Sequence, residues 1–199
     1  MILNDKRIIN LCENVGMIQP YERSLIRFIT EEDLKHSKII SYGLSSFGYD
    51  IRLSSKEFFT FRHVPGTIVD PKNFNVTNLT PGDLFHDENG SYFVIPANSY
   101  GLGVAIERLN LPRNITAVCV GKSTYARCGI IANITPAESG WSGHLTLEFS
   151  NSSSADCRIY ANEGVVQLLF LEGQECETSY EDRNGKYQNQ QETVVLSRV

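Results

Sequence analysis

Apolar residues near the start of the chain recur at helical spacing. They predict an amphipathic helix from Asp5 to about Glu13, whose apolar face carries Ile8, Ile9, Leu11 and Cys12. Asn4 precedes this run and is a favourable N-cap, because its side chain can accept a hydrogen bond from the first turn. Gly16 follows the run and is typical of a helix end. A second short helix is expected near Thr30 to His36, with Thr30 as its cap and acidic residues in its first turn.

Beyond Ile39 the pattern changes to short alternating or apolar runs, separated by Gly, Pro, Asn and Asp. Such runs predict strands. Closely spaced strands without helices between them indicate a mainly β fold, an antiparallel β-sandwich or jelly-roll-like barrel behind short N-terminal helices. The predicted strands are Tyr49–Leu53, Phe58–Arg62, Ser91–Ile95, Tyr100–Ala105, Ile115–Val120, Gly129–Ile134, His144–Phe149, Asp156–Tyr160 and Val165–Leu171.

Composition narrows the class of protein. A chain of 199 residues with 41% hydrophobic and 21% charged residues predicts one globular domain, 1–199. A net charge of −5 argues against a broad nucleic-acid-binding surface but allows a local basic pocket. The N-terminus does not resemble a signal peptide, and no apolar run reaches the length of a membrane span. We therefore expect a cytoplasmic protein that binds neither membrane nor nucleic acid, with its five cysteines reduced.

The segment Gly121–Gly129 is the first candidate for chemistry. It reads Gly-Lys-Ser-Thr-Tyr-Ala-Arg-Cys-Gly, so two cations and two hydroxyls stand between glycines. Lys122 offers a point charge and Arg127 a planar fork, and such a loop suits a phosphate chain. The spacing is not that of a Walker A loop. The alternative is a solvated turn that opens a helix.

Glu148 is the second candidate. It follows Gly140-Trp-Ser-Gly143 on a β-prone run, next to Leu147 and Phe149. If the strand is buried, burial raises the pKa of the carboxyl toward the range useful for proton transfer. The alternative is a surface glutamate on the outer face of its strand.

The end of the chain is polar. The stretch from Tyr180 to Gln191 combines tyrosines, Lys186 and several amides around Gly185. These groups suit a lid that closes over phosphates, and we expect 180–199 to form such a mobile lid. An ordinary polar tail is the alternative.

The four histidines are scattered along the chain. Zinc deaminases use an H-x-E element together with P-C-x-x-C to activate water on the metal. Neither element occurs here, so we expect no catalytic zinc and no protein metal site.

Four segments together resemble the dCTP deaminase family, relatives of the trimeric dUTPases. They follow in the family's order over most of the chain: Ser41–Leu53 (SYGLSSFGYDIRL), Gly121–Gly129, Gly140–Gly143 with Glu148, and Gly185–Gln191 (GKYQNQQ). The resemblance implies a homotrimer with active sites at subunit interfaces. It also implies hydrolysis of dCTP to dUTP and ammonia, Mg²⁺ bound through the triphosphate, and dTTP as a candidate feedback inhibitor.

The resemblance also assigns roles to residues. Glu148 is the general acid/base, Ser123 and the carbonyl of Pro136 hold the attacking water, and Arg127 stabilises the tetrahedral intermediate. The groups implied in substrate binding are Lys122, Ser123, Thr124, Tyr125, Ala126 and Arg127 in the loop, Thr146, Leu147 and Glu148 near the base, Gln167, and Tyr180, Lys186 and Gln190 at the phosphates. Glu138 stands where an Asp is common near the sugar, and Lys122 where some members carry Arg.

Three readings of function follow. Deamination of dCTP needs an acid beside the cytosine ring, and Glu148 is that acid. A dUTPase, or a bifunctional enzyme that releases dUMP and pyrophosphate, needs a second acid near the phosphates, for which Glu138 is the candidate. A non-catalytic nucleotide-sensing domain would keep the 122–127 loop without needing Glu148.

Overall fold

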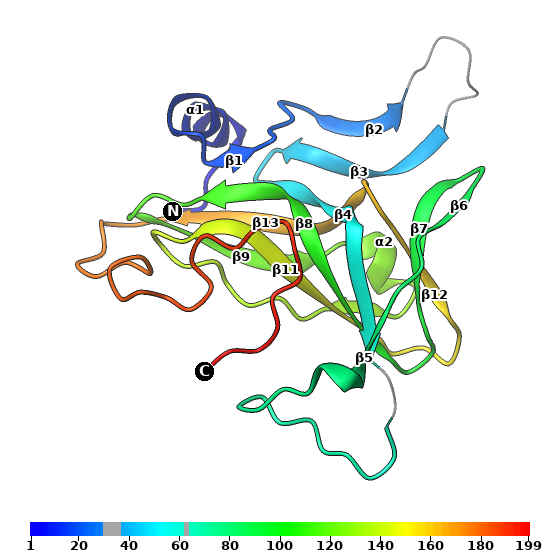
Figure 1. The fold of residues 1–199 in the computed structure, drawn as a ribbon. Coiled ribbons are helices and arrows are strands. Elements are labelled where there is room, and N and C mark those ends of the chain that lie inside the picture. The colour runs from blue at the N-terminus through cyan, green and yellow to red at the C-terminus, as the bar shows by residue number, and fades with distance from the viewer. Residues whose placement is uncertain (30–36, 62–63) are drawn as a thin grey trace.

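The computed structural model describes residues 1–29, 37–61 and 64–199, and the strands in these ranges pair antiparallel. A large curled sheet follows the order β10-β11-β8-β4-β13-β9, and a smaller one the order β12-β7-β6 (Figure 1). The elements are α1 (Asp5–Val15), β1 (Ile18–Gln19), β2 (Leu25–Ile29), β3 (Ser37–Ser45), β4 (Gly48–Phe61), η1 (Val76–Asn78), β5 (Leu79–Pro81), β6 (Phe85–Asp87), β7 (Gly90–Ile95), β8 (Tyr100–Asn110), β9 (Ile115–Gly121), α2 (Ser123–Ala126), β10 (Ile130–Ala132), β11 (Ser142–Asn151), β12 (Cys157–Tyr160) and β13 (Gly164–Glu172).

The N-terminal helix forms for the reasons read from the sequence. The Asn4 side chain accepts a hydrogen bond from the Arg7 amide at 3.1 Å. Gly16 adopts φ 65°, and its amide donates to the carbonyl of Cys12. This left-handed conformation suits glycine, so α1 ends there, two residues later than expected. The second predicted helix, Thr30 to His36, lies outside the described residues.

The predicted β fold is confirmed, with differences in the strands. The runs Tyr49–Leu53 and Phe58–Arg62 were expected to be separate, and this is wrong: β4 continues from Gly48 to Phe61. Its register against β8 shifts between Leu53 and Phe58, so the strand passes through an irregularity instead of a turn. The antiparallel pairing of β2 with β3 was not predicted.

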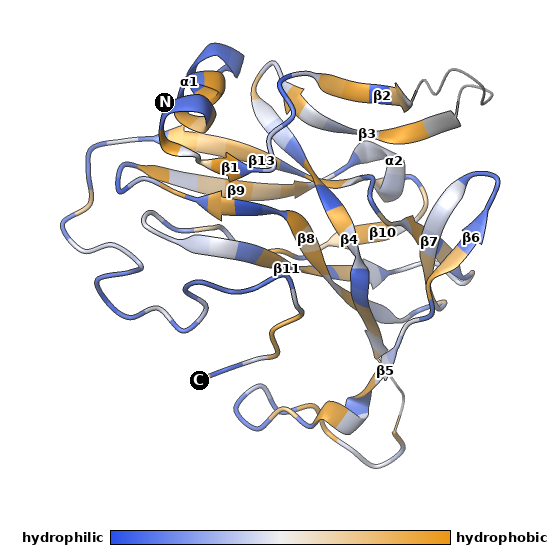
Figure 2. Cartoon of the chain, turned by 45° about the horizontal axis from the view of Figure 1, so that its top comes forward, coloured by the Kyte–Doolittle hydropathy of each residue, from blue (hydrophilic) through white to orange (hydrophobic). Residues whose placement is uncertain are grey.

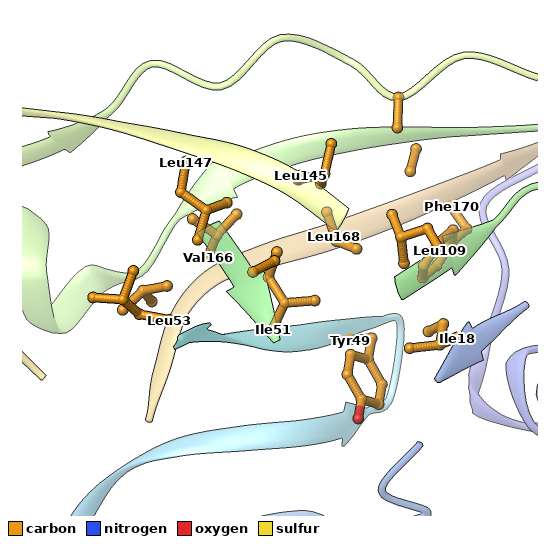
Figure 3. Packing of buried hydrophobic residues seen from close by; sticks show 14 of the residues in the cluster. Ile18, Tyr49, Ile51, Leu53, Leu109, Leu145, Leu147, Val166, Leu168 and Phe170 are labelled. Atoms are coloured by element: carbon orange, nitrogen blue, oxygen red, sulfur yellow. The ribbon is translucent and has the colours of Figure 1, made fainter. Parts of the chain in front are cut away.

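Apolar side chains from the large sheet meet inside the curl. Tyr49, Phe149 and Phe170 are fully buried, and Figure 3 shows residues from β4, β8, β11 and β13 in one cluster with Ile18. Hydrophobic residues are concentrated in the strands, whereas the C-terminal coil is largely hydrophilic (Figure 2). The core therefore holds β11 firmly, and β11 carries Glu148.

After β13 the chain returns as a coil along β11 (Figure 1). Gln190 forms a bridge with Gly143, and its carbonyl accepts from the His144 amide at 2.9 Å. The Trp141 indole donates to the carbonyl of Tyr187 at 2.9 Å. These contacts bring residues far apart in the sequence to the edge of β11 at its start.

Candidate active site

A cavity of about 520 Å³ lies between β11, the end of β4, the start of β8, the 134–141 turn and the C-terminal coil. Its size is ordinary for a small-molecule site. Its lining is Phe61, Phe74, Tyr100, Leu102, Ile134, Thr135, Pro136, Ala137, Glu138, Trp141, Leu145, Thr146, Glu148, Tyr180, Lys186, Tyr187, Gln190, Val195, Leu196 and Ser197.

Glu148 belongs to this lining because β11 alternates. Leu147 and Phe149 are buried in the core, so the intervening side chain points to the other face of the strand. The Glu148 Oε2 atom is buried and has no hydrogen-bond partner among the described residues. Burial raises the pKa of Glu148 to about 7, against a smaller lowering effect of its own backbone amide. Near neutral pH the carboxyl therefore exists in both protonation states and can give or take a proton.

Aromatic side chains form one wall of the cavity. The rings of Phe61 and Tyr100 meet edge to face at 5.2 Å, and Phe74 meets Phe61 in the same manner at 6.0 Å. Burial raises the pKa of Tyr100 to about 12, and the charge of Glu148 adds to this, so the phenol lies near the carboxyl. A planar ring can pack on such a wall beside Glu148.

The turn before β11 supplies Pro136 and Glu138. It is fixed by paired hydrogen bonds between Ala117 and Ala137, each 2.9 Å from amide to carbonyl. Pro136 lies at the cavity, as the resemblance implies. Glu138 is also at the cavity, but its carboxylate is half exposed and pairs with the Arg183 guanidinium.

The C-terminal coil covers the cavity with Tyr180, Lys186 and Gln190, which the sequence analysis had selected. The Gln190 amide donates to Thr146 Oγ1 at 2.6 Å, and Lys186 Nζ donates to the carbonyl of Arg198 at 2.5 Å. These polar groups are thus engaged by the protein itself. A ligand that binds them must replace these bonds.

The 122–127 turn does not line this cavity. Its side chains at Ser123, Thr124 and Arg127 are exposed, and the Arg127 guanidinium folds back onto the Ser123 carbonyl at 2.9 Å. Tyr125 is buried instead, and its hydroxyl accepts a hydrogen bond from the Tyr160 amide at 2.8 Å. Within one chain the two halves of the expected site therefore lie apart.

Lys122 and Gln167 lie with this turn and away from the cavity. Lys122 turns inward to an ion pair with Asp50, whose side chain is 6% exposed. Gln167 stands opposite Asp50 in the β4–β13 ladder. No local sequence pattern pointed to Asp50 or to the aromatic wall. Asp50 does belong to the segment Ser41–Leu53, one of those that carry the resemblance.

Among the described residues there is no group of three or more His, Cys, Asp or Glu side chains placed to hold a metal ion. A divalent cation at this site would therefore need other oxygen donors, such as those of a polyphosphate. No helix within the described ranges is long and apolar enough to cross a membrane.

Comparison with known proteins adds the family. Residues 3–173 match the family model described as dCTP deaminase-like. A dCTP deaminase of Acinetobacter baumannii (strain AYE) is 50% identical over 190 residues, 95% of each chain. One of Chromohalobacter salexigens is 47% identical over 199 residues, 100% of this chain and 99% of the other. The crystal structure of a 2'-deoxycytidine 5'-triphosphate deaminase from Agrobacterium tumefaciens shares the fold, with a TM-score of 0.55 at 17% identity. The match covers 86% of this chain and 48% of that one, so this chain spans about half its length.

Proposed function

The chain belongs to the dCTP deaminase-like family, and we infer that it hydrolyses the 4-amino group of dCTP, giving dUTP and ammonia. The observation that carries this inference is Glu148: its Oε2 atom is buried without a hydrogen-bond partner in the described part of the chain, its pKa is raised to about 7, and it lies at a cavity with an aromatic wall.

The chemistry follows from that carboxyl. Its ionised form takes a proton from water as the oxygen attacks C4 of the cytosine ring, and it passes the proton to N3. The remaining hydroxyl proton of the tetrahedral intermediate then reaches the amino group through the same carboxyl. The C4–N bond breaks, ammonia leaves and N3 keeps its proton. An acid with a pKa near the working pH does both steps well, typically for about 10²–10⁴ in rate.

The other catalytic groups require a second subunit in this proposal. The 122–127 turn lies away from the chain's own cavity, and its Ser123 and Arg127 are exposed. We therefore propose a homotrimer in which the turn of one subunit completes the cavity of the next. There Ser123 and the carbonyl of Pro136 would hold the water, and Arg127 would stabilise the intermediate.

The triphosphate would lie between that turn and the C-terminal coil. Lys186, Tyr180 and Gln190 provide a cation and hydrogen-bonding groups at the cavity, and Thr146, which also lines it, would border the base. Leu147 was expected there too, but its side chain is buried in the core on the other face of β11. In this proposal 180–199 is the lid: Lys186 exchanges the carbonyl of Arg198 for phosphate oxygens when it closes. Mg²⁺ would enter with the substrate, on phosphate oxygens, and zinc would play no part.

The product is dUTP in this proposal. Hydrolysis at phosphorus needs its own activated water in line with the leaving pyrophosphate. Glu138, the acid considered for it, is half exposed and held by Arg183. Because dTTP carries the same deoxyribose and triphosphate as dCTP, it would compete for this site as a feedback inhibitor. We place the enzyme in the cytoplasm, where these nucleotides are made and used.

Product analysis tests the function. Purified protein is incubated with dCTP and Mg²⁺, and the nucleotides are separated over a time course while ammonia is measured. The expected result is one dUTP for each ammonia, with no dUMP. Formation of dUMP at the rate of ammonia would make the enzyme bifunctional. Binding of dCTP without any product would favour a nucleotide-sensing domain.

A further inference from the structure

We propose that Asp50 is a positioning residue for the reaction: through its buried ion pair with Lys122 it holds the turn that carries Ser123 and Arg127. This inference rests on the proposed function, because it gives the turn its catalytic meaning. It also changes the role of Lys122, whose ammonium becomes an internal tether and not a ligand of the triphosphate.

Asp50 occupies a central place in the sheet beneath the turn. It lies on β4, opposite Gly43 of β3 on one side and Gln167 of β13 on the other. Lys122 comes directly after β9, which is the other neighbour of β13. Its ammonium pairs with Asp50 Oδ2 and also donates to Ser41 Oγ at 3.3 Å. The turn is thereby fastened to β3 and β4, which are distant in sequence.

Burial decides what this lysine can do. The Lys122 side chain is 10% exposed and that of Asp50 6%, whereas Ser123, Thr124 and Arg127 are exposed. A phosphate that approaches the outer face of the turn meets the hydroxyls and the guanidinium, while the ammonium points inward to a carboxylate that neutralises it. A buried pair of this kind is held strongly, because either charge alone would be costly to bury.

The pair is connected to the catalytic residues by the backbone. Lys122 is the N-cap residue of α2, and its carbonyl accepts from the Ala126 amide at 3.0 Å. The Ser123 carbonyl accepts from the Arg127 amide at 3.2 Å. The cap makes no side-chain hydrogen bond to the turn, and α2 has only four residues. An isolated turn of this length would not hold itself. Its orientation therefore depends on tertiary contacts, and the tether at Lys122 fixes its first residue while the buried Tyr125 ring anchors its middle.

The two oxygens of Asp50 are used unequally. Its Oδ1 atom is buried without a hydrogen-bond partner among the described residues. Burial raises the pKa of Asp50, and Lys122, then Gln167, oppose this. The carboxylate therefore relies on Lys122, and the tether is lost when either charge is removed.

The chain offers a matched control on the same strand. Arg52, two residues beyond Asp50, forms a buried ion pair with Glu107 of β8, 2.7 Å from Nε to Oε1, and Glu107 is fully buried. Glu107→Gln removes a buried charge beside β4 and leaves the residues of the 122–127 turn and their contacts with Asp50 unchanged. A loss that reflects stability alone will appear in this variant as well.

The test compares Asp50→Asn, Lys122→Met and the double variant with Glu107→Gln. Steady-state kinetics with dCTP and hydrogen–deuterium exchange of the peptide covering 121–129 are measured in the full-length protein. We expect Asp50→Asn to lower kcat at least tenfold with KM within about threefold, because small misplacements of catalytic groups are costly. Exchange in 121–129 should rise in Asp50→Asn and Lys122→Met, and not in Glu107→Gln. The double variant should lose no more kcat than either single one.

The inference is overturned if exchange in 121–129 stays at the level of Glu107→Gln. It is also overturned if Lys122→Met raises KM for dCTP while kcat is kept, since Lys122 would then bind phosphate. Because the double variant leaves no unpaired charge buried, kinetics and exchange can be measured on it where a single variant does not fold. If the unaltered protein releases no ammonia from dCTP, the proposed function fails, and the exchange data still decide whether the tether exists.

Discussion

Replacement of Glu148 by glutamine should stabilise the protein, and only at high pH. A carboxyl whose pKa is raised on folding holds its proton more tightly in the folded than in the unfolded chain. Above about pH 7 it therefore destabilises the folded state, and the penalty fades as the pH falls toward 4.5. Glutamine has the same shape and never ionises, so Glu148→Gln removes the penalty.

The size of the effect follows from the pKa. A rise from 4.5 to about 7 corresponds to at most about 3–4 kcal/mol, at ~1.4 kcal/mol per pH unit. For a chain of this length each kcal/mol moves the melting temperature by about 2–4 °C. At about pH 8 the variant should thus melt up to ~14 °C higher than the unaltered protein, and near pH 4.5 the two should nearly coincide.

The assay is denaturant unfolding, or thermal unfolding where reversible, at a series of pH values and one protein concentration. Glu175→Gln is the control, because Glu175 is exposed beyond the end of β13, and it should show no such pH-dependent gain. The reasoning is refuted if Glu148→Gln is no more stable than the unaltered protein at about pH 8, or if its gain does not change with pH.

Three further outcomes are expected. Lys186→Ala should raise KM for dCTP far more than KM for deoxycytidine, since only the triphosphate offers charge to the ammonium. An equal rise of KM for both substrates would mean that segment 180–199 has a structural role and does not bind the triphosphate. Tyr125→Phe leaves the Tyr160 amide without its 2.8 Å acceptor, so the free energy of unfolding should fall by about 1–3 kcal/mol while KM for dCTP is kept. A raised KM with unchanged stability would instead mean that Tyr125 contacts the substrate. Elemental analysis of active protein should find no stoichiometric zinc, and an inhibition by chelators should be reversed by Mg²⁺ alone; zinc whose removal abolishes activity would contradict this.

The sequence was sufficient for the local features of the fold. The spacing from Ile8 to Cys12, with Asn4 and Gly16, predicted α1, and the apolar neighbours of Glu148 predicted that it stands on a largely buried strand. It failed at β4, because the polar residues after Leu53 look like a break. Ser54 is instead buried and donates to Glu192 at 2.7 Å, a partner 138 positions away.

The candidate site likewise combines features that the sequence predicted with features that it did not. Glu148, Pro136 and Lys186 reach one cavity as the motifs suggested. The direction of Lys122 depends on Asp50, 72 positions earlier, and no local pattern contains that contact. The aromatic wall likewise joins Phe61 and Tyr100 from different strands. Contacts between residues distant in the sequence, and not local propensity, therefore determine the direction of Lys122 and the position of the aromatic wall.

Glu148 is proposed to move the protons of dCTP deamination, and a comparison of two proteins decides whether it does. Ammonia release from dCTP is measured for the unaltered protein and for Glu148→Gln, with dCTP binding measured for both by calorimetry. We expect the variant to bind dCTP with similar affinity and to release ammonia about 10²–10⁴ times more slowly. Near-normal ammonia release by Glu148→Gln would contradict it.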